Sequence, residues 1–305
     1  MDVKTLVITA RPWSFIMTVI VLLSSFIYAA YLGYEVAPLL AALALIGSIL
    51  LHASVNVIND YFDYKRGVDR PDVGTVKYRI HPIIHGVMSS GSTFKLAAGL
   101  AAAALAIGLY ITLQDRPLAI ALGLLGLALG WGYSLDPPGF KYRGLGELAV
   151  FIAFGPVMFA GGFYAATGVL DMRALALSIP LGLMIAAVLL ANNIRDADTD
   201  SRAGITTLAV ILGREKAFIL YAAMVFASYL IVAIMVALNL VPPTTLIILA
   251  SLYTFYNLYA TVKRKGIPAD FDPRTAKVVT QFGVLLILGI TLGIVLGLEA
   301  ASLYI

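Results

Sequence analysis

The sequence has 305 residues, of which 61% are hydrophobic and only 12% are charged, and its mean hydropathy is +0.94. Soluble domains carry about 25% charged residues, so the composition excludes an ordinary soluble protein and predicts an integral membrane protein. Cysteine is absent, which excludes disulfides, thiolate metal sites and cysteine nucleophiles. The formal net charge of +4 is explained by where the basic residues lie, and we expect no nucleic-acid partner.

Runs of about 20 apolar residues can cross the hydrocarbon core of a bilayer as helices. The chain holds about nine such runs, which predicts an all-α, polytopic membrane fold. In chain order the expected spans are roughly 12–33, 37–59, 94–113, 117–134, 147–167, 173–194, 216–238, 243–262 and 276–297. Residues 1–11 carry Lys4 and Arg11 among apolar residues and are expected to lie in the membrane interface.

The basic residues fall almost entirely on one side of this predicted membrane protein. If the N-terminus is inside, every Lys and Arg except Arg116 and Arg173 lies on the N-terminal side. Cytoplasmic loops carry the excess of Lys and Arg in membrane proteins. We therefore expect a multi-pass protein of the cell membrane, with its N-terminus and its polar site in the cytoplasm and its C-terminus outside.

The second expected span ends in a cluster of amides and carboxylates, within the string NVINDYFDYKRGVD. Asn56, Asn59, Asp60 and Asp63 follow i, i+3, i+4, i+7 spacing, so they would share one face of a helix. Basic side chains follow this cluster at Lys65, Arg66, Arg70, Lys77 and Arg79.

The sixth expected span ends in a matching cluster, within NNIRDADTD. Asn192, Asp196 and Asp200 recur every four residues, and Asn193 and Arg195 lie beside them. More basic side chains come from Arg202, which follows this cluster, and from Lys141 and Arg143 in the short connection SLDPPGFKYRGLGE.

Two clusters with the same Asn-to-Asp spacing predict a site for divalent cations. Mg²⁺ takes oxygen ligands and is usually bound by one or two carboxylates together with substrate phosphates. We expect two Mg²⁺ ions with a diphosphate between them, held by Asn59, Asp60, Asp63, Asn192, Asp196 and Asp200. One cluster alone would be as well explained by ordinary polar residues at a helix end. The basic residues would bind phosphate oxygens, with Arg195, Lys141 and Arg143 best placed, although the positive-inside bias explains about half of them.

The two clusters lie four expected helices apart, which indicates a duplicated unit. We predict two four-helix pseudo-repeats, about 10–134 and 145–262, around a central cavity, with a final helix at about 276–297. Such an arrangement would bring the acid clusters face to face.

Other polar residues are expected to have plainer roles. His52 precedes Asn56 by one helical turn and is interpreted as a hydrogen-bonded core residue. His81 and His85 are four residues apart, as in some zinc sites, but Pro82 and Gly86 argue against a regular helix there, and we exclude zinc. Asp270 and Asp272, near the basic run 263–265, are interpreted as part of a solvated loop.

These motifs resemble the UbiA superfamily of intramembrane aromatic prenyltransferases. Its first acidic motif is matched by Asn59, Asp60 and Asp63, extended by Gly67 and Asp69, and its second by Asn192, Asn193, Arg195, Asp196 and Asp200. The strings YRGLGEL (142–148) and FGPVMFAGGFYAATG (154–168) are similar to the branch that acts on 1,4-dihydroxy-2-naphthoate. The similarity runs from about residue 10 to residue 282.

The resemblance implies Mg²⁺-dependent transfer of a polyprenyl group, geranylgeranyl or longer, from its diphosphate to an aromatic acceptor. In the naphthoate branch the acceptor loses CO₂ and the product leads to menaquinone. Asp60, Asp63, Asp196 and Asp200 would be catalytic. Substrate would be bound by Asn56, Asn59, Lys65, Arg66, Lys141, Arg143, Asn192, Asn193, Arg195 and Arg202.

Two departures from the naphthoate pattern leave the acceptor open. The linker RPDVGTVKYRIHPIIHGVMSSG has an unusual form, and Thr206 stands where Lys or Arg is more common. Acceptors such as 4-hydroxybenzoate or geranylgeranylglyceryl phosphate therefore stay possible within the same chemistry. A secondary transporter of an anionic solute is the alternative of another class, but carrier sites usually lie near the midplane on broken helices.

Overall fold

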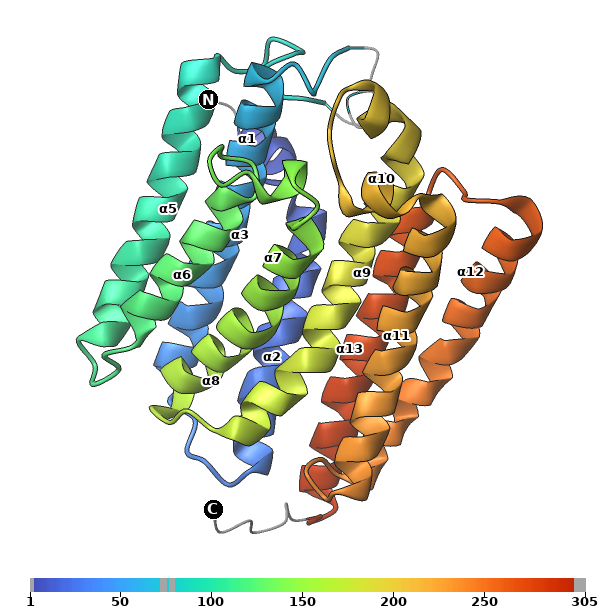
Figure 1. Cartoon of the computed structure of the whole chain (residues 1–305). Coiled ribbons are helices and arrows are strands. Elements are labelled where there is room, and N and C mark those ends of the chain that lie inside the picture. Colours follow the sequence, from blue (N-terminus) through green and yellow to red (C-terminus); the bar gives the residue numbers. More distant parts are fainter. Residues whose placement is uncertain (1–2, 72–75, 77–79, 299–305) are drawn as a thin grey trace.

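The computed structural model describes residues 3–71, 76 and 80–298, and in these residues every regular element is helical. Figure 1 shows long helices running side by side between the two ends of the molecule. Helices suit a bilayer because each one satisfies its own backbone hydrogen bonds. Eight helical segments of the described chain are long and apolar enough to cross a membrane, and the apolar helix α6 (Ala119–Gly132) is shorter. The expected all-α membrane fold of about nine spans is confirmed, with the count approximate.

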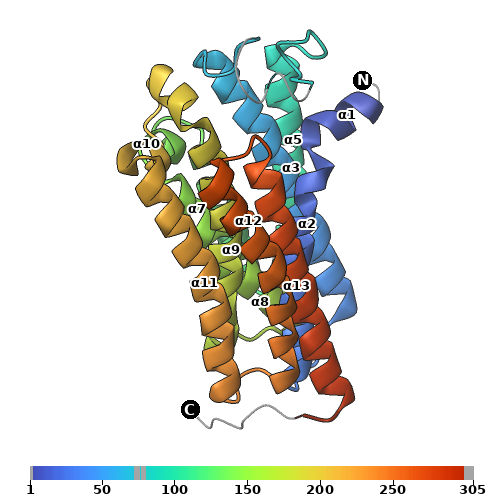
Figure 2. The same cartoon turned by 90° about the vertical axis from the view of Figure 1, so that its right-hand side faces the viewer.

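The elements before the middle of the chain include a short helix, α1, that lies at an angle across one end of the bundle (Figure 2). They are α1 (Val3–Ala10), η1 (Pro12–Ser14), α2 (Phe15–Tyr31), α3 (Pro38–Lys65), α5 (Ser90–Thr112), α6 and η2 (Phe140–Tyr142). The next span is built from three consecutive pieces, α7 (Gly146–Ile152), the π-helical η3 (Ala153–Phe159) and α8 (Ala160–Thr167). The rest are α9 (Met172–Arg202), α10 (Leu208–Leu212), α11 (Arg214–Ala237), η4 (Pro243–Ser251), α12 (Leu252–Lys265) and α13 (Phe271–Val295).

Helix α9 forms the centre of the main hydrophobic core. It packs against α2, α7, α11 and α13, and α13 in turn packs against α2 and η4. Leu177, Leu181 and Met184 on α9 are fully buried in this core. The last helix therefore belongs to the middle of the bundle, where it joins the first span to the helix that carries the second acid cluster.

The two helices that carry the acid clusters are longer than predicted. Helix α3 continues to Lys65 and α9 to Arg202, whereas the expected spans end at residues 59 and 194. The difference arises because an apolar run ends where the membrane ends, while a helix continues as long as its backbone bonds and local contacts support it. Both acid clusters are thus held on rigid helical turns, not in loops.

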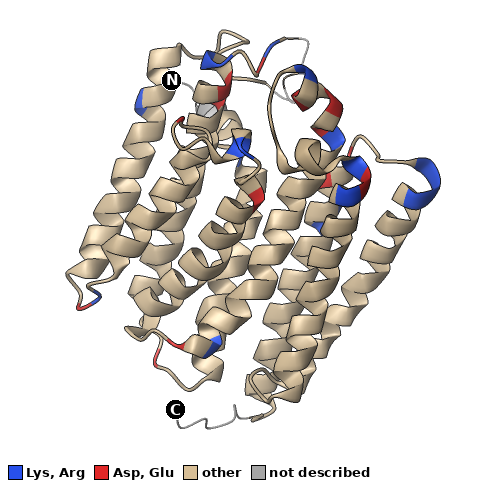
Figure 3. Cartoon of the chain, in the orientation of Figure 1, with Lys and Arg blue, Asp and Glu red and all other residues tan. Residues whose placement is uncertain are grey.

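Charge gathers at one end of the bundle. Figure 3 shows almost all positions of Lys, Arg, Asp and Glu at the end of the bundle where α1 lies, with a few exceptions at the far end. Among the described residues, the exceptions are Glu35 in the α2–α3 loop, Asp115 with Arg116 in the α5–α6 loop, and Asp171 with Arg173 at the start of α9. The chain is therefore polar at one end of its membrane helices, and both acid clusters lie there.

Candidate active site

The first acid cluster lies on the last two turns of α3 and is buried. Asp60 has no exposed surface, and Asp63 is 3% exposed. Carboxylates are rarely this buried unless they are paired with cations or bind metals. Each of the two has a basic partner that comes from a different part of the chain.

Arg11 is the partner of Asp60. It lies between α1 and η1 with left-handed backbone angles, φ 56° and ψ 60°, which turn the chain so that its guanidinium reaches α3. Asn56 holds this turn in place, because its amide donates to the Ala10 carbonyl at 2.9 Å and to Ser14 Oγ at 3.0 Å. Asn56 thus supports the N-terminal turn in this structure, and its expected contact with substrate is a proposal.

Asp63 is bound by two side chains of η2. Lys141 Nζ donates to one carboxylate oxygen at 2.7 Å, and the Tyr142 hydroxyl donates to the other at 2.8 Å. Burial alone would lower the pKa of Lys141, but the Asp63 carboxylate holds it above its usual value. Burial and Asp63 both raise the pKa of Tyr142. At neutral pH the carboxylate therefore faces one charged and one neutral donor.

The second cluster, at the end of α9, is organised by Arg195. Its guanidinium donates to Asn192 Oδ1 at 2.6 Å, to both oxygens of Asp196 at 2.8 and 2.6 Å, and to Asp272. Asp272 lies in the first turn of α13, so the expectation that it belongs to a solvated loop is wrong. The fold brings the start of α13 to the end of α9, whereas Asp270 does remain exposed and pairs with Arg274.

The two clusters share one electrostatic site. The charges of Lys141, Asp196 and Asp63 all act on the Asp200 carboxylate, although Asp63 lies on α3 and Asp200 on α9. Tyr133 lies among the same groups, where burial raises the pKa of its hydroxyl. Asp63 and Asp200 therefore lie close enough for their charges to act on each other, and the face-to-face arrangement of the two clusters stays a prediction.

Two of the predicted amides have buried partners. Asn193 donates to Glu147 Oε1 at 2.8 Å, and Asn59 donates to Ser134 Oγ at 2.7 Å. The other oxygen of Glu147 is buried and makes no hydrogen bond. These pairs connect α3 to Ser134, just after α6, and α9 to Glu147, in the first turn of α7, so they fix both ends of the loop that carries Lys141.

The other basic side chains that were predicted to lie at the site, as far as the structure describes them, do not contact the carboxylates of the two clusters. Arg66 and Arg143 both bind Asp136, and the Arg66 guanidinium lies 4.0 Å from the centre of the Tyr142 ring. Lys65 lies over the Tyr61 ring at 4.9 Å, and Arg202 is exposed at the last turn of α9. Of the predicted basic residues, Lys141 and Arg195 contact the acids, while Lys77 and Arg79 lie outside the described residues.

The three histidines differ in their burial and in their polar contacts. His52 is hydrogen-bonded to Thr18 Oγ1 at 2.8 Å and contacts Ser14 Oγ at 3.3 Å, which confirms that it is hydrogen-bonded as expected, and its side chain is half-buried. His85 is exposed, whereas His81 is fully buried and its Nε2 lies 3.2 Å from Asp69 Oδ2. The turn that contains both histidines is irregular, as Pro82 and Gly86 predict.

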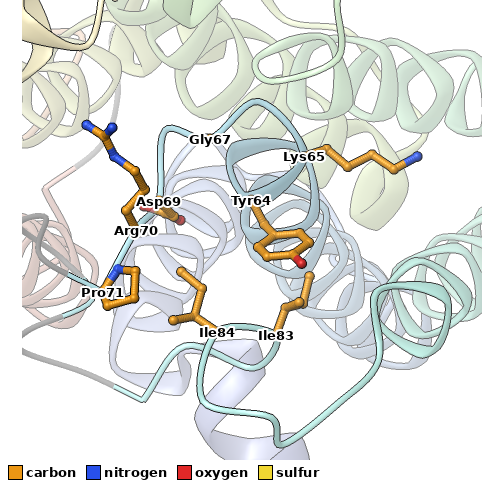
Figure 4. Close-up of a pocket in the computed structure, with 8 residues that line it drawn as sticks. All are labelled: Tyr64, Lys65, Gly67, Asp69, Arg70, Pro71, Ile83 and Ile84. Carbon is orange, nitrogen blue, oxygen red and sulfur yellow. The ribbon is translucent and has the colours of Figure 1, made fainter.

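An open pocket of about 590 Å³ adjoins the first cluster at the charged end (Figure 4). Its residues mix apolar, basic and acidic side chains, and they are Tyr64, Lys65, Gly67, Asp69, Arg70, Pro71, Ile83 and Ile84. Figure 4 shows Lys65 and Arg70 extending outwards on opposite sides. Asp69 therefore lies between the surface pocket and the buried acids.

Several residues of this site were missed in the sequence, and their signals were weak. Arg11 stands directly before a proline at the start of an apolar span, which in retrospect marks a turn with a charge in it. Glu147 is a lone acid at the start of an apolar stretch, and such a residue is costly to bury. Tyr142 and Asp272 carry no local signal, because only the fold brings them to the acids.

Comparison with known proteins supports a family assignment. The sequence matches the UbiA prenyltransferase family over residues 18–271. It is 33% identical over 231 residues to the UbiA prenyltransferase domain-containing protein 1 homolog of Drosophila melanogaster, covering 75% of this chain and 64% of that protein, which is less than two thirds of its length. It is 29% identical over 261 residues to 1,4-dihydroxy-2-naphthoate octaprenyltransferase of Bacillus subtilis (strain 168), covering 84% of this chain and 83% of that protein.

The fold has a counterpart of known structure. It is similar to a UbiA homolog from Archaeoglobus fulgidus bound to GPP and Mg²⁺, with a TM-score of 0.70 and 18% sequence identity over 95% of this chain and 98% of that chain. At this identity the likeness shows the fold alone. The family match extends over most of the membrane helices and includes both acid clusters. The chain is therefore a multi-pass membrane prenyltransferase, and it belongs to the UbiA prenyltransferase family.

Proposed function

We propose that this enzyme transfers a polyprenyl group from its diphosphate to 1,4-dihydroxy-2-naphthoate, at a site formed by the acid ends of α3 and α9. The single observation that carries the proposal is the convergence of these two helix ends, in which Asp63 and Asp200 act on each other and on one lysine. The carboxylates are buried on α3 and half-buried on α9. Such a site suits an anionic substrate that binds together with cations.

The residues present fit Mg²⁺. One oxygen each of Asp60 and Asp69 and a nitrogen of His81 lie within 4.8 Å of one another, and these carboxylates are hard oxygen ligands. On the second side Asp196 and Asp200 offer further oxygens beside Asn192. We propose that the aspartates of both clusters hold Mg²⁺ together with Asp63 and Asn59. Each cluster would bind one ion, which makes two ions in all. When bound, the metal would neutralise the diphosphate and so make it a better leaving group.

The chain's own residues have distinct parts in this reaction. Lys141 and Arg195 carry positive charge at the two clusters and would bind phosphate oxygens as the C–O bond breaks. Arg11, now paired with Asp60, would turn to phosphate when a cation takes its place on the carboxylate. The apolar helices around the site would keep water from the allylic cation. The electron-rich naphthoate ring then attacks, and its carboxylate leaves as CO₂.

The choice of acceptor is supported by the loop that follows η2. The string YRGLGEL resembles the naphthoate branch, and the chain is similar to an octaprenyltransferase named for this acceptor. The backbone of Arg143 in this loop pairs with Thr206, which is one of the two departures from the branch pattern. The acceptor would therefore contact a loop that is tied to the segment after α9.

The site would face the cytoplasm, since the charged end of the bundle carries the basic residues. The prenyl diphosphate, geranylgeranyl or longer, would have its tail among the apolar helices and in the bilayer. The N-terminus would share the cytoplasmic side. These placements rest on charge and composition.

The test is an assay in membranes with Mg²⁺, geranylgeranyl diphosphate and 1,4-dihydroxy-2-naphthoate, following the product lipid, CO₂ and diphosphate. We expect a prenylated, decarboxylated naphthoquinol, and chelation of Mg²⁺ should stop its formation. Asp60→Ala and Asp196→Ala should abolish turnover. Asp198→Ala is the matched control, because Asp198 lies on the same helix end but is exposed and pairs with Arg214.

The outcomes separate the alternatives. Transfer only to 4-hydroxybenzoate or to geranylgeranylglyceryl phosphate would overturn the acceptor and keep the reaction. Wild-type rates in either aspartate variant would overturn the cation site. No transfer to any acceptor, with Mg²⁺-independent flux of an anion instead, would contradict the prenyl-transfer proposal and favour a carrier.

A further inference from the structure

His81 reaches the acid site from the loop between α3 and α5. It is fully buried, and its Nε2 lies 3.2 Å from Asp69 Oδ2. Nε2 makes no hydrogen bond within the described residues, although the Asp69 carboxylate lies within reach of it. A buried polar nitrogen with one neighbouring carboxylate needs an explanation, because leaving it unpaired costs about 1–3 kcal/mol.

The end of α3 brings Asp69 to this histidine. Gly67 adopts the left-handed conformation, with φ 69°, and this turns the chain back after the last helical turn. The Asp63 carbonyl then accepts from the Val68 N–H at 2.9 Å and the Asp69 N–H at 3.2 Å. The turn places Asp69 beside Asp60, where one ligand atom from each and one from His81 lie within 4.8 Å of one another.

The hydrogen bonds of the other ring nitrogen, Nδ1, determine whether Nε2 of His81 carries the ring proton. Nδ1 accepts the backbone N–H groups of Ile83 and Ile84, each at 3.2 Å. A neutral imidazole has one donor and one acceptor nitrogen, and the bond that one makes sets the role of the other. Since Nδ1 accepts, the ring proton is on Nε2. His81 therefore presents an N–H to Asp69, with no lone pair for a metal.

We propose that His81 is a positioning residue that donates from Nε2 to Asp69 and so sets this carboxylate beside Asp60 for a cation. The site keeps oxygen ligands only, which suits Mg²⁺ better than a site with a nitrogen ligand. The inference rests on the proposed function, because that function places a cation at these aspartates. Loss of such an outer partner typically costs about 10–100-fold in metal affinity.

The test measures metal binding directly, with no prenyl substrate present. Mn²⁺ is titrated into the purified full chain in detergent and followed by electron paramagnetic resonance. His81→Gln carries an amide N–H that reaches Asp69, whereas His81→Asn offers an oxygen to the turn N–H groups but is too short to reach it. We expect His81→Asn to weaken the Mn²⁺ site about 10–100-fold and His81→Gln to stay close to the wild type.

Two results would overturn the proposal. Wild-type affinity in His81→Asn would show that the histidine only shapes its turn. A nitrogen hyperfine coupling of directly bound imidazole on Mn²⁺ in the wild type would show that His81 is itself a ligand. Asp60→Asn separates this inference from the proposed function. If Asp60→Asn loses Mn²⁺ and His81→Asn keeps it, the inference fails alone; if Asp60→Asn, Asp69→Asn and His81→Asn all keep it, the cation site and the proposed function both fail.

Discussion

Lys141 contacts Asp63 and also acts on the charge of Asp200. Replacing it with Met would leave a buried carboxylate without its ion-pair partner and remove a positive charge from the diphosphate site. We expect Lys141→Met to lower kcat by about 10²–10³-fold, as for loss of one preorganised donor in other active sites. The rate of prenyl transfer in membranes measures this effect.

The matched control is Lys216→Met, which changes an exposed lysine at the same end of the bundle. Equal rates in both variants would contradict a role for Lys141 at the site. Because its pKa is raised, Lys141 stays charged through the neutral range. Its charge would be lost only as pH rises beyond the ordinary lysine pKa of about 10.4, so we expect no decline in rate from this residue at lower pH.

Asp171 is the centre of a small group of polar contacts at the end of the bundle opposite the acid clusters. It caps α9 through the Arg173 N–H at 2.7 Å, pairs with the Arg173 guanidinium at 2.6 Å and accepts from the Tyr34 hydroxyl at 2.9 Å. Burial would raise the pKa of Asp171, but the bonds from Arg173 lower it overall. A carboxyl group whose pKa is lowered by folding stabilises the folded state at pH values above its ordinary pKa. This contribution is lost as the pH falls through the lowered pKa.

We therefore expect Asp171→Asn to lower the melting temperature in detergent at neutral pH. The difference from the wild type should shrink only when pH falls below about 4, the ordinary Asp pKa. Asp115→Asn, in an exposed loop at the same end, is the control and should melt like the wild type. A difference that is unchanged at low pH would contradict the role of the charge.

Residues whose signal is local were predictable, and residues whose partners are distant were not. The acids of each cluster are recognisable because their spacing places them on one helix face. Arg11 and Asp60 are 49 residues apart, and Arg195 and Asp272 are 77 apart, so their pairing depends on which helices pack together. No periodicity within one helix contains that information, which is why Asp272 was misread as a loop residue.

At the scale of elements, α9 approaches α7 and the π-helical segment η3 closely. A Cβ on Gly182 would meet the Phe151 carbonyl oxygen at 2.9 Å and the Gly155 Cα at 3.0 Å. Both neighbours are backbone atoms, so a side chain here must push the two helices apart. The apolar runs of the sequence predict the membrane helices, but the close contact between α9 and this segment can be seen only in the folded structure.

Gly182→Ala is therefore expected to destabilise the protein by about 1–3 kcal/mol, the usual cost of overpacking. Thermal unfolding in detergent measures it. Gly99→Ala is the control, because a Cβ at Gly99 on α5 would meet no atom within 4 Å. That change should be neutral or slightly stabilising, since alanine is the better helix former. Equal melting temperatures in the two variants would mean that α9 and η3 do not meet in this way.

For the whole molecule, the asymmetry of charge predicts which face of the membrane holds the site. Of the Lys and Arg residues that the structure describes, all except Arg116 and Arg173 fall at the end where α1 and both acid clusters lie. Basic loops are retained in the cytoplasm during insertion. A diphosphate-binding site placed there would receive its polar substrates from the cytoplasm and its prenyl tail from the bilayer.

The absence of cysteine makes this orientation directly testable, because one introduced thiol is the only site for labelling. Lys216→Cys and Gln114→Cys change exposed residues at opposite ends of the bundle. We expect a membrane-impermeant maleimide to label Gln114→Cys in intact cells and Lys216→Cys only in inside-out vesicles. The reverse pattern would place the acid clusters outside the cell. Two explanations predict basic residues around the site: retention of basic loops in the cytoplasm, and binding of an anionic substrate. Only the first of them fixes the side of the membrane. The reverse labelling pattern would therefore leave the anionic substrate as the explanation of the charge asymmetry.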